Sequence, residues 1–160
     1  MFLRKSNVFL VLLCAALSLL GFYLSYLNSR PIPIGLLVAS GPVTSAEAGQ
    51  RRGRSSIHTV WFTIEGEAHR FAYPGILPRI RDAWERMEIG SHVEVIYAAT
   101  PDEKHETEIW GLTISGTKIV GPIEAHEARL KNGYFGLALG FAFAGCAAYT
   151  WRQASRRRPA

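Results

Sequence analysis

Two uncharged stretches decide the fold: VFLVLLCAALSLLGFYLSYL at residues 8–27 and YFGLALGFAFAGCAAYTW at residues 134–151. A helix rises ~1.5 Å per residue and the hydrocarbon core of a bilayer is ~30 Å thick. Stretches of twenty and eighteen residues are therefore long enough to cross it, and they predict two transmembrane helices. The 106 residues between them, 28–133, suit one small domain.

A cleaved signal peptide is the alternative interpretation of residues 8–27. Its apolar region would be roughly 7–15 residues long, with a cleavage site of small residues after it. The apolar run in this chain is longer, and it is followed by Asn28, Ser29, Arg30 and Pro31 rather than by an A-x-A-like site. We therefore predict an uncleaved membrane helix.

The formal charge of +5 is unevenly distributed. Residues 28–133 hold all thirteen acidic residues and twelve Lys and Arg, so the middle of the chain is nearly neutral and unsuited to nucleic acid. The other cations flank the apolar stretches at the two ends: Arg4, Lys5, Arg152, Arg156, Arg157 and Arg158. Positive flanks stay on the cytoplasmic side, so we expect residues 1–7 and 152–160 in the cytoplasm and the middle domain outside.

Small residues recur along both apolar stretches. In the second they are spaced by four: Gly136, Gly140, Ala144 and Ala148. In the first they form a comparable stripe: Cys14, Ser18, Gly21 and Ser25. Small faces let helix backbones approach closely in lipid, so we predict that the two helices pack together as a hairpin. A homodimer through the glycines of the second helix is the alternative.

The domain between the helices shows the period-two alternation of strands. Strands are predicted at 36–40, 58–64, 68–73, 93–97, 110–114 and 118–120. Helical spacing predicts one short helix at 77–87 and a second at 122–131 that leads into the second span, and 45–56 is predicted to be an exposed loop. The expected fold class is α+β: a small antiparallel β-barrel or sandwich with one short helix, of oligosaccharide-binding or similar small-barrel shape, flanked by two transmembrane helices.

The sequence resembles the bacterial family called domain of unknown function 3592. The resemblance is carried by ASGPV at 39–43, by VWFTIEG at 60–66 running into HRF at 69–71, and by IGSHVEVIY at 89–97 followed by Pro101. It covers roughly 65 residues and implies a small β-domain beside membrane helices. It also implies a bacterial inner membrane as the location, and it brings no catalytic residues.

Candidate chemistry is sparse, and we predict no catalytic, cofactor or metal site. A metal could use the carboxylates and imidazole of residues 102–108, but the spacing matches no EF-hand. Three histidines on or beside predicted strands, His58, His69 and His92, are a second metal hypothesis. A solvated loop and ordinary strand histidines explain both patterns without a metal.

The expected function is therefore interaction. We predict a two-pass, non-catalytic membrane protein that presents its β-domain to a protein or to the cell envelope, by strand-edge pairing or through a basic loop. That loop contains Arg51, Arg52 and Arg54, which could meet anionic lipid headgroups or an acidic partner. The alternatives are a membrane-bound metal-dependent hydrolase and an accessory subunit of a larger membrane complex.

Overall fold

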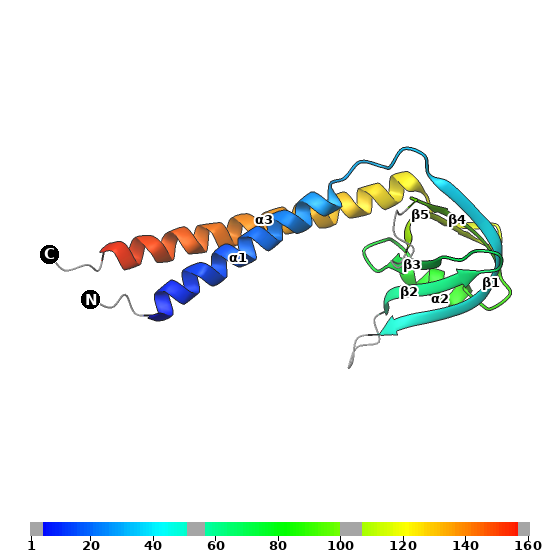
Figure 1. The fold of residues 1–160 in the computed structure, drawn as a ribbon, viewed down its shortest axis with the longest axis horizontal. Coiled ribbons are helices and arrows are strands. Elements are labelled where there is room, and N and C mark those ends of the chain that lie inside the picture. Colours follow the sequence, from blue (N-terminus) through cyan, green and yellow to red (C-terminus); the bar gives the residue numbers. More distant parts are fainter. Residues whose placement is uncertain (1–4, 51–56, 100–106, 157–160) are drawn as a thin grey trace. The chain divides into compact units, whose positions relative to one another are not determined.

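The computed structural model describes residues 5–50, 57–99 and 107–156, which form three helices and six strands (Figure 1). Contacts divide the chain into two compact units. One contains Met1–Arg30 and Leu130–Ala160, and the other is Pro31–Arg129. The predicted α+β class is confirmed.

Two long helices, α1 (Lys5–Asn28) and α3 (Pro122–Arg156), make up the described part of the first unit, although the first turns of α3 belong to the second. Within them Val8–Asn28 and Pro122–Ser155 are long and apolar enough to cross a membrane. The short helix predicted at 122–131 and the predicted span at 134–151 are one uninterrupted helix. No proline follows Pro122 within α3, so nothing in the backbone forces a break between them.

The second unit is a closed β-barrel. Its strands are β1 (Leu37–Gln50), β2 (Ile57–Ile64), β3 (Arg70–Pro74), β4 (His92–Tyr97), β5 (Thr107–Ile114) and β6 (Thr117–Val120). They pair in the order β3-β2-β1-β4-β5-β6, and a parallel pairing of β3 with β5 closes a ring of five strands. Of the predicted barrel or sandwich, the barrel is correct.

Alternation along the strands fills the barrel. On β2, Val60, Phe62 and Ile64 are buried while the residues between them face outward. Equivalent positions on the other strands complete one apolar core: Val43, Phe71, Tyr73, Val93, Val95, Ile109, Leu112 and Ile114. A tight turn joins β5 to β6. Ser115 and Gly116 have φ of 47° and 77°, the pair of positive values that a type I′ hairpin requires.

The predicted loop at 45–56 is wrong in its first part, because residues 45–50 continue β1. The first half of β1 pairs with β4 and the second half pairs with β2, with a register shift between Val43 and Ser45. Small side chains in this half permit the pairing, since Trp61 of β2 lies directly over Gly49. Residues 45–50 have the small, polar composition of a loop. In this strand the small side chains leave room for the Trp61 ring.

The short helix α2 (Ile80–Arg86) lies between β3 and β4 and is shorter than the predicted 77–87. Arg79 adopts a left-handed conformation, with φ 59° and ψ 33°, and therefore cannot lie inside a right-handed helix. Leu77 and Met87 are nevertheless buried, and Ile80 and Trp84 pack against the core, so the apolar spacing identified the correct face.

Candidate functional site

The outer surface of β1, β2 and β3 carries the most varied set of recognition groups in the described barrel. Because Val60 and Phe62 point into the core, Trp61 between them points outward. Strand register places Glu47 of β1 on one side of Trp61 and Ala72 of β3 on the other. We call Glu47, His58, Trp61 and Arg70 the Trp61 face.

Trp61 is held between the sheet and two polar side chains. The Arg70 guanidinium carbon lies 5.4 Å from the centroid of the indole, within cation–π range. The same guanidinium donates to Glu47 Oε2 at 2.6 Å, so an ion pair crosses over β2. The His58 ring meets the indole edge-on, with centroids 6.2 Å apart. A Cβ at Gly49 would lie 2.7 Å from the Trp61 ring, so only glycine fits beneath it.

Hydroxyl groups extend this surface along the same strands. Thr63, the next outward position after Trp61, has its Oγ1 within 2.7 Å of both Thr44 Oγ1 and Ser45 Oγ. The hydroxyl contacts are exposed, and both side chains of the Arg70–Glu47 pair are about half exposed or more. Exposed cationic, anionic and hydroxyl groups therefore surround a half-buried Trp61 whose indole nitrogen is buried, a combination that favours recognition of a polar partner.

A serine and a histidine that are distant in sequence meet on the neighbouring strands. Ser40 Oγ of β1 lies 3.0 Å from His92 Nε2 of β4, and the contact is exposed. Nucleophilic catalysis would also need a group that orients the imidazole and donors for an oxyanion. In the described ranges, His92 has Ser40 as its one side-chain hydrogen-bond partner. The pair therefore supplies a hydroxyl and an imidazole in contact, without the orienting group that catalysis would also need.

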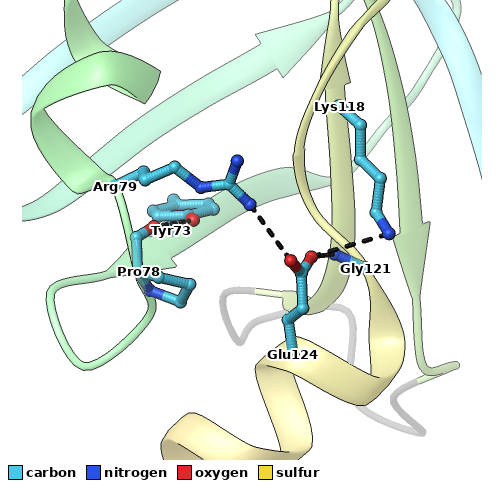
Figure 2. Close-up of polar contacts among 6 residues, drawn as sticks. All are labelled: Tyr73, Pro78, Arg79, Lys118, Gly121 and Glu124. Atoms are coloured by element: carbon cyan, nitrogen blue, oxygen red, sulfur yellow. Dashed lines mark hydrogen bonds and ion pairs between the residues drawn. The ribbon is translucent and has the colours of Figure 1, made fainter.

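A second polar cluster lies where α3 begins (Figure 2). Glu124 Oε2 accepts a hydrogen bond of 2.8 Å from the backbone N–H of Gly121, which caps the first turn of α3. Its carboxylate also meets Arg79 at 3.3 Å and Lys118 at 3.6 Å. The Gly121 hydrogen bond, with Lys118 and Arg79, lowers the pKa of Glu124. This cluster joins the start of α2, strand β6 and the start of α3.

Tyr73 lies buried beside that cluster. Its hydroxyl donates to the carbonyl of Pro78 at 2.5 Å, which fixes the chain just before the left-handed Arg79 (Figure 2). Burial raises the pKa of Tyr73 well above its ordinary value, so the phenol stays protonated and keeps this bond. The arrangement is structural.

Arg129 forms a third cluster and is buried. Its Nη2 donates to the carbonyl of Ile109 at 2.9 Å and its Nη1 pairs with Glu108. The guanidinium carbon lies 4.5 Å from the ring centroid of Trp110. Burial lowers the pKa of Arg129, while Glu108 opposes that shift. These contacts bind the second turn of α3 to β5, and nothing in the sequence pattern pointed to them.

The predicted helix-packing residues fall into two groups. Gly136 and Gly140 are buried, and Gly21 faces them so closely that a Cβ would lie 2.7 Å from Gly140 N and 2.8 Å from Gly136 O. Ser18 Oγ donates to the Gly140 carbonyl at 2.9 Å. Ala144 is half-buried and Ala148 is exposed.

Helix geometry explains the difference. Each four-residue step exceeds a turn of ~3.6 residues by about 40°, so the stripe has rotated by about 120° at Ala148. On α1 the steps alternate between four and three. All four small residues therefore stay on one face and are buried: Cys14, Ser18, Gly21 and Ser25.

The other predicted site residues do not converge in the part of the chain that the structure describes. Arg51, Arg52 and Arg54 lie outside the described residues, as do positions 102–106 of the acidic cluster. His58 lies beside Trp61, His69 beside Phe71 and Tyr97, and His92 beside Ser40. Among described residues, no three His, Cys, Asp or Glu side chains group closely enough to hold a metal ion.

Comparison of the chain with family profiles, with curated proteins and with solved structures finds no match.

Proposed function

We propose that this chain is a two-pass protein of a bacterial cytoplasmic membrane that presents its barrel on the outer side, for interaction with a protein or an envelope component and without catalysis. One observation carries the proposal. Two helices of membrane-spanning length pack backbone to backbone in one unit, and a closed barrel with its own core forms the other. Helix pairs with small residues at the contact are typical of membrane proteins.

Charge distribution supports the orientation. The cations outside 28–133 lie at the two chain ends, and positive flanks stay in the cytoplasm. A hairpin of two spans puts both ends on one side, so the barrel lies on the other. The family resemblance, with its small β-domain beside membrane helices, belongs to the same proposal.

The barrel supports a binding role. Its closed order β1-β2-β3-β5-β4, with α2 between β3 and β4, suits the oligosaccharide- and oligonucleotide-binding type, in which the β2–β3 face and adjacent loops bind ligands. The Trp61 face lies on those strands. An accessory-subunit role or a homodimer through Gly136 and Gly140 is less suited, because α1 already occupies that face.

A labelling experiment tests the topology. In a Cys14→Ala, Cys146→Ala background, single cysteines are placed at Ser115 in the barrel and at Gln153 near the end of α3. A membrane-impermeant maleimide applied to intact spheroplasts should label position 115, and should label position 153 only after lysis. Labelling of position 153 without lysis would contradict the proposed orientation.

Contact at the Trp61 face is tested by crosslinking in living cells. A photoreactive amino acid at position 61 should yield a discrete adduct, at several times the amount obtained from the same residue at exposed Thr117. Arg70→Glu should reduce that adduct, because it removes the cation next to position 61 and places a second carboxylate beside Glu47. Sensitivity of the adduct to protease or to muramidase distinguishes a protein partner from a cell-wall polymer. Equal adducts from positions 61 and 117 would rule this face out.

A further inference from the structure

The chain that leads from α1 into β1 carries apolar side chains that the barrel does not cover. Residues 31–38 read PIPIGLLV, and the next charged residue after Arg30 is Glu47. Ile32 and Leu36 pack against the barrel core. Two side chains between and after them point away: Ile34 is fully exposed and Val38, at an outward position of β1, is 61% exposed.

This exposure is built into the segment. Two prolines restrict the backbone at positions 31 and 33, and the inward anchors at Ile32 and Leu36 hold the intervening Ile34 outward. Leaving Ile34 and Val38 in water would be costly, since burying an aliphatic side chain of this size is worth roughly 1.5–3 kcal/mol. A patch of this kind indicates a contact surface.

Chain length limits what that surface can meet. Ile34 is six residues beyond Asn28, the end of α1, so it lies at most about 21 Å from that end however the two units are arranged. The end of α1 carries the residues typical of a membrane interface. Tyr23 and Tyr26 are exposed, and the Arg30 guanidinium lies 5.6 Å from the Tyr26 ring centroid.

We propose that Ile34 and Val38 lie in the lipid interface at the outer end of α1, so that this edge of the barrel is a second membrane contact. The proposal rests on the proposed function, because it requires α1 to span the bilayer. Lipid suits the surface better than a protein edge or a second copy. Residues 31–38 contain no charged or polar side chain that would specify a protein partner, and they are tethered within reach of the headgroup region.

Depth-dependent quenching tests the proposal on the full-length protein. In the Cys14→Ala, Cys146→Ala background, a polarity-sensitive fluorophore is attached to single cysteines at Ile34, Val38, Ile89 and Leu19. The protein is reconstituted into phosphatidylcholine–phosphatidylglycerol vesicles, with or without a nitroxide near the top of the acyl chain. Ile89 is the matched control, an isoleucine of the barrel that is 76% exposed and distant from both spans in sequence.

We expect quenching at positions 34 and 38 to exceed that at position 89 by about threefold or more, as for side chains seated at the acyl boundary. Leu19, exposed on α1, reports whether the helix lies in lipid. If Leu19 is protected from water but positions 34 and 38 behave like position 89, the interfacial contact is overturned while the proposed function stands. If Leu19 is also in water, both are overturned.

Discussion

Replacing Gly21 by leucine should separate the two long helices. A Cβ at this position would lie 2.7 Å from the backbone nitrogen of Gly140 and 2.8 Å from the carbonyl oxygen of Gly136. Both neighbours are helix backbone and cannot move aside as a side chain could. We expect a loss of hairpin stability of at least about 3 kcal/mol, because overpacking against rigid structure lies at the costly end of the usual range.

The helix separation can be measured directly. Spin labels are attached to single cysteines at exposed Leu20 and Leu139, with Cys14 and Cys146 replaced by alanine. Pulsed electron paramagnetic resonance then reports the distance between α1 and α3. Gly21→Leu should lengthen and broaden that distance distribution.

The chain provides a matched control for this substitution. A Cβ at Gly145 of the same hairpin meets nothing within 4 Å. Gly145→Leu should therefore leave the distribution unchanged. Indistinguishable distributions for the two variants would show that close backbone approach does not hold the hairpin together.

Removing Arg129 should destabilise the barrel more than any change to an exposed arginine. Arg129→Ala leaves the carbonyl of Ile109 without its donor and uncovers the ring of Trp110. We expect a cost of about 2–4 kcal/mol, combining an orphaned acceptor with a lost desolvated cation–π contact. Tryptophan fluorescence during thermal unfolding in detergent should show a fall in Tm of roughly 10 °C or more.

Two further variants test whether the effect comes from the contacts of Arg129. Arg129→Lys keeps the charge but has no planar fork to serve both Glu108 and the Ile109 carbonyl, so it should fall between wild type and Arg129→Ala. Arg81→Ala removes an exposed arginine from α2 and should cost less than about 0.5 kcal/mol. If Arg129→Ala matches Arg81→Ala, Arg129 does not fasten α3 to β5.

Much of this fold was predictable because its signals are local. The two apolar stretches, the alternation from Val60 to Ile64 and the Ser115–Gly116 turn each depend on neighbours within a few residues. The small-residue stripes were also visible. Which small residues are buried depends on their spacing. On α1, spacings that alternate between four and three keep the small residues on one face, whereas the constant spacing of four on α3 leaves Ala148 exposed.

The candidate site was not predictable, because it depends on register. Glu47, Trp61 and Arg70 come from three strands, and they meet only because Glu47 pairs with Trp61 and β3 lies on the other side of β2. The second half of β1 has the small polar composition of a loop, which concealed that pairing. Arg79 is a similar case, since its left-handed backbone directly follows Pro78, whose carbonyl accepts a hydrogen bond from Tyr73 of another element.

In the part of the chain that the structure describes, the ring of strands closes through a short seam. Where β3 meets β5, the described register contains two residue pairs, Phe71 with Thr107 and Ala72 with Glu108. Every other junction in the ring is an antiparallel ladder of at least five pairs. Amide protons along those ladders should exchange with solvent mainly when the whole unit unfolds, whereas those at the seam are free to exchange through local opening. The barrel can thus open between β3 and β5 while the antiparallel ladders of the other strands stay intact.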